Sequence, residues 1–162
     1  MKNLFFCLLA LVFFGCASTK NMDEPQKKEL LAYTQKFEAQ NFLVVASYIN
    51  PIYAQEKGED GMDKNDDFIV SLYPKEAGIL IHTIEVNGSS DEISVHLLND
   101  DEPLLDKLAF RTPWAKYYKI SVPAKDGSVL NLSFSAGGEN SQTHQVSLNF
   151  QKIARSLYWS PR

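Results

Sequence analysis

Cysteine is scarce in this sequence. The 162 residues contain two, Cys7 and Cys16, and both lie near the N-terminus. Cys7 lies inside an apolar run, so cleavage after that run would leave Cys16 without an internal partner. This excludes a disulfide framework for the mature chain, and an unpaired thiol is unfavourable in an oxidising compartment.

Positive charge is also in short supply. The chain has 16 Lys and Arg against 20 Asp and Glu, a formal net charge of −4. Lys2 is the only charged residue before Cys16, so a processed chain is more acidic still. Non-specific binding to nucleic acid needs a basic surface, and the composition therefore argues against a nucleic-acid partner.

The sequence lacks an apolar run long enough to cross a bilayer. Leu4–Phe14 is apolar throughout, but a helix of this length spans only about 16 Å of a bilayer core of about 30 Å. A basic residue, a short apolar region and a small residue in this order are typical of a secretory signal. We predict that residues 1–15 are a lipoprotein signal peptide.

The end of this run resembles the bacterial lipobox. Gly15 and Cys16 match its pattern, whereas Phe14 departs from the usual small residue and keeps an ordinary signal peptide open as an alternative. The resemblance implies that Cys16 carries a diacylglyceryl group and becomes the mature N-terminus. In that family Asp after the cysteine tends to retain a protein in the inner membrane, so Ala17 implies a lipid anchor in the outer membrane.

The composition changes twice after Cys16. Residues 16–26 are polar and are predicted to be a flexible tether. Leu30, Leu31 and Phe37 then follow at roughly helical spacing, which predicts a short helix over 27–40.

Short runs rich in β-branched and aromatic residues fill most of the remaining chain, 41–162. Several alternate strictly between apolar and polar residues, as half-buried strands do. The pattern predicts an all-β fold, an antiparallel β-sandwich of about seven strands that is immunoglobulin-like and preceded by the short helix. The runs are FLVVASYI, DFIVSLY, GILIHTIEV, EISVHLL, AKYYKISV, SVLNLSFSA and HQVSLNFQ.

With its signal, its Cys16 and this strand-rich region over about 40–151, the chain resembles the small immunoglobulin-like outer-membrane lipoproteins of Campylobacter and Helicobacter relatives. It lacks the Cys–Trp–Cys core of true immunoglobulin domains. The resemblance implies an envelope location, with the membrane held as a partner through the acyl chains on Cys16. It brings no active site with it.

Residues that could carry catalysis or hold a metal form no recognisable set. The histidines His82, His96 and His144 are not at metal-ligand spacing, and we expect His82 to be a core residue. No nucleophile elbow or phosphate-binding glycine loop is present. We therefore predict no catalytic residue, no metal, no cofactor and no enzyme activity. The acidic residues from Glu59 to Asp67 lack the spacing of a calcium loop and are expected to form a solvated loop.

Asn87-Gly88-Ser89 supports two predictions. Asn-Gly favours a type I′ hairpin turn, because both positions tolerate a positive φ. The same residues form an N-x-[ST] acceptor, and Glu85 two positions ahead makes them resemble the extended acceptor of the bacterial N-glycosylation system. We therefore predict a hairpin and an N-glycosylation site at Asn87.

Two functions fit these observations. The first is a lipid-anchored binding or structural module that presents loops or a sheet edge to a protein partner, in adhesion or envelope assembly. The alternative is a periplasmic small-ligand binder or an envelope enzyme, which a pocket with converging polar groups around His82 or His144 would favour.

Overall fold

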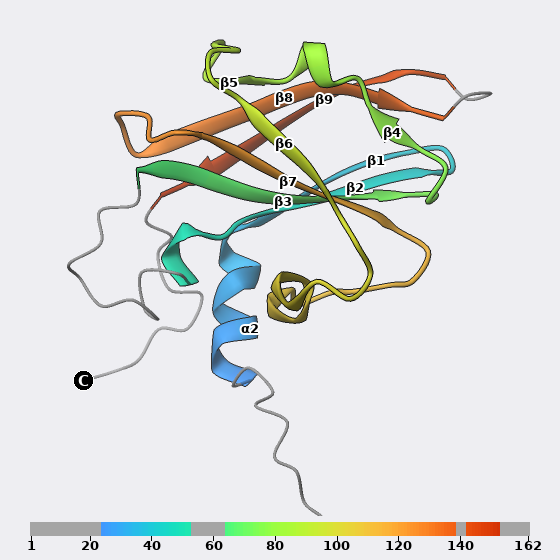
Figure 1. The fold of residues 1–162 in the computed structure, drawn as a ribbon, viewed down its shortest axis with the longest axis horizontal. Coiled ribbons are helices and arrows are strands. Elements are labelled where there is room, and N and C mark those ends of the chain that lie inside the picture. The colour runs from blue at the N-terminus through green and yellow to red at the C-terminus, as the bar shows by residue number, and fades with distance from the viewer. Residues whose placement is uncertain (1–23, 53–63, 139–141, 153–162) are drawn as a thin grey trace, which may run out of the picture.

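The computed structural model describes residues 24–52, 64–138 and 142–152. Within them the chain is mostly β, and two antiparallel sheets pack face to face (Figure 1), so the predicted sandwich with a short helix before it is confirmed. The first sheet has the order β1-β2-β3-β7-β6, with the bounds Thr34–Ala39, Phe42–Tyr48, Asn65–Tyr73, Lys116–Pro123 and Ser94–Leu98. In the second sheet β8 (Val129–Gly137) pairs on one side with β4 (Gly78–Ile79) and β5 (Glu85–Val86), and on the other with β9 (His144–Gln151).

The core lies between the sheets and follows the alternation of the sequence. In β8 and β9 every second side chain is buried, and the residues between them are polar and face solvent. Phe150 of β9 contacts Phe68 of β3 across the two layers, with ring centroids 5.2 Å apart. Each fully buried side chain of this size contributes about 1.5–3 kcal/mol.

The outer face of the five-stranded sheet is covered as well. Helix α2 (Glu24–Ala32) and the 3-10 turn η3 (Pro103–Lys107) lie against the side that faces away from the second sheet (Figure 1). Leu30 and Leu105 are completely buried there. Tyr117 of β7 is only 2% exposed, and its hydroxyl donates to the Thr112 carbonyl at 3.0 Å and accepts from the Thr112 amide at 2.8 Å.

The predicted helix over 27–40 is wrong in its second half. The helix ends at Ala32, and Thr34–Ala39 forms β1, which pairs antiparallel with β2 in the register Thr34↔Ser47 to Ala39↔Phe42. The Thr34 hydroxyl donates to the Leu30 carbonyl at 2.8 Å and so satisfies a carbonyl at the end of the helix. Pairing with β2 overrides the weak local helical spacing.

The run GILIHTIEV does not form one central strand. It forms β4, the 3-10 turn η2 (Ile81–Thr83) and β5 along one edge of the second sheet. The Thr83 hydroxyl donates to the Leu80 carbonyl at 2.6 Å and accepts from the Ser135 amide at 2.8 Å, in place of a regular ladder. As a result His82, predicted to be a core residue, is exposed. One predicted run divides into β4 and β5, and β1 is an additional strand. The described residues therefore form nine strands where seven were predicted.

The sheet edges differ in how well they are protected. β1 lies beside β9, and the rings of Phe37 and His144 are 6.2 Å apart. β9 is one edge of the second sheet; the other edge, formed by β4 and β5, is interrupted by η2. β6, five residues long, has no further strand on its second side within the described chain. Among the described residues, β6 is therefore an uninterrupted edge strand whose outer side has no strand partner.

Candidate functional site

The predicted anchor lies outside the described residues. This applies to the signal peptide over 1–15, to Cys16 and to most of the tether over 16–26. Among the described residues, no helix is both long and apolar enough to span a membrane. Helix α2 begins at Glu24, so residues 17–23 connect it to Cys16.

Asn87 lies where the sequence places it, at the tip of a hairpin. Asn87 and Gly88 have φ angles of 52° and 75°, as a type I′ turn requires. Val86 and Ser89 pair across the turn, with N···O distances of 2.8 Å and 3.1 Å. Asn87 is exposed.

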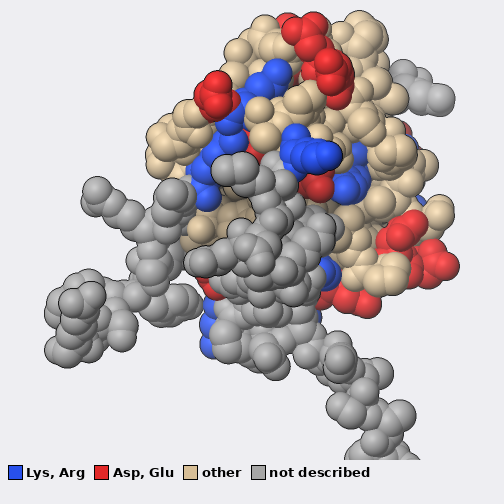
Figure 2. All heavy atoms as spheres, turned by 60° about the vertical axis from the view of Figure 1, so that its left-hand side comes forward, with Lys and Arg blue, Asp and Glu red and all other residues tan. Residues whose placement is uncertain are grey.

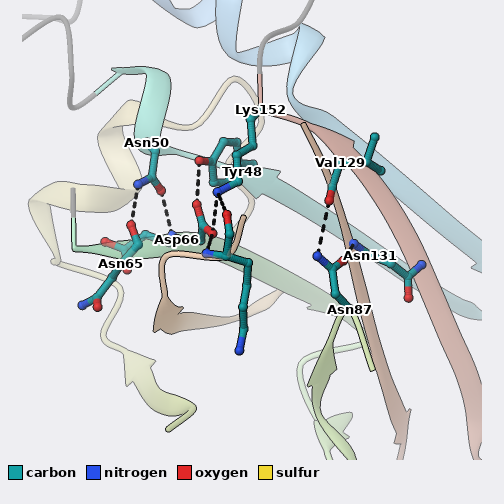
Figure 3. A network of polar contacts seen from close by, with 10 residues as sticks. Tyr48, Asn50, Asn65, Asp66, Asn87, Val129, Asn131 and Lys152 are labelled. Carbon is teal, nitrogen blue, oxygen red and sulfur yellow. Dashed lines mark hydrogen bonds and ion pairs between the residues drawn. The ribbon is translucent and has the colours of Figure 1, made fainter. Parts of the chain in front are cut away.

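The carboxamide of Asn87 is nevertheless engaged with β8 (Figure 3). Its Oδ1 accepts from the Asn131 amide at 2.7 Å, and its Nδ2 lies 3.4 Å from the Val129 carbonyl. The Asn87 backbone amide also donates to the Asn131 carbonyl at 2.8 Å. A glycosyltransferase that acted on the folded chain would have to detach this nitrogen from β8 first.

A buried carboxylate forms the centre of the most extensive polar network among the described residues (Figure 3). Asp66, 2% exposed, accepts from the Tyr48 hydroxyl at 2.9 Å and from the Lys125 amide at 2.8 Å. The Lys152 ammonium lies 2.9 Å from Asp66 Oδ2 and donates to the Lys125 carbonyl at 2.5 Å. The network thereby joins β2, β3, the β7–β8 turn and the end of β9.

This network corrects the predicted solvated loop at Asp66 and Asp67, whereas Glu59, Asp60 and Asp63 of the same prediction lie outside the described residues. Asp66 and Asp67 belong to β3, and Asn50 bridges this strand by bonding the Asn65 carbonyl and the Asp67 amide. Asp66 shares the parity of Phe68 and Val70, and therefore points into the sandwich. That alternation is the signal by which the sequence could have revealed it.

The end of the sandwich that holds Asp66 also carries cationic side chains. Figure 2 looks towards this end and shows basic side chains gathered in a stripe, with acidic ones mostly at its margins. Lys119 pairs with Asp67 at 3.0 Å on the face of β3 opposite to the pair between Lys152 and Asp66. Since a buried charge is costly without a partner, these cations stabilise the two carboxylates. The two ion pairs tie neighbouring segments to β3.

The three histidines lie apart. His82 is exposed on η2, His96 is exposed on β6 and bonds Ser94 at 2.9 Å, and His144 begins β9. No group of three metal-ligating side chains occurs in the described part of the chain.

His144 stacks on Phe42, with ring centroids 5.0 Å apart and an interplanar angle of 16°. It borders an open hollow of about 250 Å³ where the turns after β1, β3 and β8 meet. The described residues that line it include no carboxylate, lysine or arginine: Gln40, Asn41, Phe42, Pro74, Gly138, Gln142 and His144.

β6 pairs with β7 on one side, and on its other side it has no strand partner among the described residues and carries an exposed apolar side chain. Leu97 is 60% exposed. Next to it lies a groove of about 190 Å³, lined by Leu97, Leu98, Ala115, Tyr117 and their polar neighbours Lys75, Asn99, Asp100 and Lys116. The groove lies on the two strands at the margin of the sheet, β6 and β7. We refer to β6 with this groove as the β6 edge.

Comparison with known proteins yields one similar solved structure to report. No family model matches the chain, and no curated protein matches it. Among solved structures, a DUF4426 family protein of Pseudomonas aeruginosa PAO1 is similar, with a TM-score of 0.47 and 15% sequence identity over 76% of this chain and 98% of that chain. This similarity carries no argument about function.

Proposed function

We propose that this chain is a lipid-anchored protein of the bacterial outer membrane whose β-sandwich acts as a non-catalytic binding or structural module for a protein partner, in adhesion or envelope assembly. The observation that carries the proposal is the β6 edge. An open edge can take up an extended segment of a partner as an additional strand. Natural sheets usually protect such edges with lysine, proline or a bulge, and β6 instead presents Leu97.

The anchor fits this role because the tether is short. The eight steps from Cys16 to Glu24 reach at most about 29 Å when the chain is fully extended. An acylated Cys16 would therefore hold the sandwich close to the membrane, with its open edge available to a neighbouring envelope protein. Two or more acyl chains are needed for stable anchoring, and the lipobox resemblance implies that number on Cys16.

The anchor is tested with Cys16→Ala in the native host. We expect the wild-type chain in the membrane fraction, with an intact mass that includes the lipid and begins at Cys16. The variant should lack the lipid mass and should no longer be cut before residue 16. A wild-type chain that carries no lipid mass at Cys16 and is recovered in the soluble fraction would contradict a lipoprotein.

The partner is tested by affinity capture from native envelopes with the acylated protein. Leu97→Lys places a charge on the open edge, and Ile81→Lys is its matched control, because Ile81 is 59% exposed but lies on η2. A specific partner should be captured by the wild type and by Ile81→Lys, and lost with Leu97→Lys. If all three chains captured the same proteins, the partner would not bind through the β6 edge, and this part of the proposal would be wrong.

A small-ligand binder is the second candidate, and the hollow beside His144 favours it. Uncharged polar side chains and an aromatic platform fit a neutral ligand with hydroxyl or amide groups. N-acetylglucosamine is a suitable probe, and at millimolar concentration it should shift the ring resonances of His144 if this class of ligand binds. Resonances that do not move would argue against the hollow as a binding site for such ligands.

A further inference from the structure

We propose that the β6 edge binds an extended segment with basic residues at both of its ends, which adds to the five-stranded sheet as a sixth strand. The inference rests on the proposed function, because it specifies the chemistry of the protein partner. It does not depend on the lipid anchor.

The negative charge around β6 determines which partner fits. Asp91 and Glu92 precede the strand, and Asp100, Asp101 and Glu102 follow it. The acidic groups therefore flank both ends of a strand whose middle, Val95 to Leu97, carries no formal negative charge.

Part of this charge is neutralised within the chain. Lys75 pairs with Asp100 at 2.9 Å, and Arg111 donates to the Asp100 carbonyl and pairs with Asp106 at 2.5 Å. Within the described chain, Glu92, Asp101 and Glu102 take part in no ion pair. Lys125 Nζ lies 3.5 Å from Ser89 Oγ, which bonds Asp91, and Lys116 lines the groove, so the negative charge without an ion-pair partner among the described residues is that of Glu92 before β6 and of Asp101 and Glu102 after it.

This distribution disfavours a second copy of the chain as the occupant. Two β6 strands that paired antiparallel would bring the acidic turn before one strand next to the acidic turn after the other. Like charges placed opposite each other are destabilising. A segment with lysine or arginine at both ends would instead be attracted at both turns.

The groove supplies a position for an apolar side chain of that segment. Its walls include Leu97, Leu98, Ala115 and the edge of Tyr117, and its volume of about 190 Å³ accommodates one or two side chains. Five residues of β6 extend over about 17 Å, so the matching part of the partner is about five residues long. The groove lies at the C-terminal end of β6, where Lys75, Asp100 and Lys116 also line it, so only a side chain near that end of the added segment would reach it while the main chain pairs with β6.

The test uses three synthetic peptides and the mature chain purified from its own host. One peptide has a short alternating Thr–Val core with lysines at both ends, and a second has the same core with glutamates at both ends. A third repeats the lysine peptide with N-methyl groups along one edge, which removes backbone donors and keeps the charge. We expect the lysine peptide to bind at least about tenfold more tightly than the glutamate peptide, and the N-methylated peptide not to bind.

Binding should perturb the amide resonances of Ser94–Leu98 and weaken as salt is added. Leu97→Lys should abolish it, whereas Ile81→Lys should leave it unchanged. The double variant Asp101→Asn, Glu102→Gln should lower the affinity for the lysine peptide by about three- to tenfold, because each exposed charge pair contributes little.

Equal binding of the lysine and glutamate peptides would refute the role of charge. Binding that survives Leu97→Lys, or that maps away from β6, would refute the site, and so would dimerisation of the chain through β6 in sedimentation. If no peptide binds, this inference fails. The proposed function is then judged separately by the envelope capture, which uses native proteins and makes no assumption about their charge.

Discussion

The buried carboxylate of Asp66 allows the most quantitative prediction. In Asp66→Asn the oxygen that accepts from the Tyr48 hydroxyl is kept, but an NH₂ group replaces the oxygen that faces two donors, the Lys125 amide and the Lys152 ammonium. The substitution therefore removes two accepted hydrogen bonds and one negative charge. Lys152 loses its counter-ion at the same time.

Removal of one partner from a buried ion pair costs about 3–5 kcal/mol. The side chain of Asp66 is 3% exposed and that of Lys152 is 21% exposed, so water can take over part of the solvation of the ammonium. We therefore expect the free energy of unfolding to fall by about 3 kcal/mol in Asp66→Asn. Tyr48→Phe, which removes the hydrogen bond from the Tyr48 hydroxyl to this charged group, should cost about 1.5–3 kcal/mol.

Equilibrium urea unfolding in a Cys16→Ala background, followed by far-UV circular dichroism, measures these changes. The m-value should stay constant, because the surface exposed on unfolding is unchanged. Asp126→Asn is the control, since Asp126 is exposed in the same β7–β8 turn and should change stability by less than about 0.5 kcal/mol. If Asp66→Asn is as stable as this control, the carboxylate does not hold the strands together and the reasoning is wrong.

Three further predictions concern single positions. Gly137→Ala places a Cβ 2.9 Å from the Gln142 carbonyl oxygen and 3.1 Å from the Thr143 Cα, and should lower the free energy of unfolding in urea by about 1–3 kcal/mol. Gly78→Ala should be nearly neutral, because the nearest atom to its new Cβ, the Tyr118 hydroxyl oxygen, lies 3.7 Å away. Burial raises the pKa of Tyr118 above its ordinary value of 10.0. The unfolded chain then ionises first, so stability should fall as the pH rises above about 10, and ultraviolet titration should show one tyrosine that ionises late; a tyrosine with an ordinary pKa at this position would contradict the burial. Asn87→Gln should increase the gel mobility of protein made in a host that has the glycosyltransferase, and an unchanged band would count against a glycan.

The sequence predicts the regular parts of the fold well. In β8 and β9 the alternation of Leu130, Leu132 and Phe134 with polar residues is strict, and both strands lie where this pattern indicates. The boundary between α2 and β1 could not be found in this way, because β1 exists through its pairing with β2, which comes later in the chain. Thr83 interrupts the expected strand at η2 through bonds to β8, another partner distant in sequence.

The candidate site could be predicted only in part. The sequence marks Ser94–Leu98 as a strand and its neighbours as acidic, but nothing local shows that β6 lies at the edge of a sheet. That position depends on the strand order β1-β2-β3-β7-β6, which long-range pairing determines. Tyr117 illustrates the same limit, since it is buried and its hydroxyl bonds Thr112 in the β6–β7 connection, whose path does not follow from the local sequence.

Site-specific photocrosslinking in living cells of the native host tests the central claim most directly. A photoreactive residue is placed at Leu97 on the open edge, and in a separate chain at Ile81, which is similarly exposed on the other sheet. We expect one discrete crosslinked adduct with a protein partner from position 97 and no adduct from position 81. No adduct from position 97, or the same adducts from both positions, would contradict a binding module that uses the β6 edge.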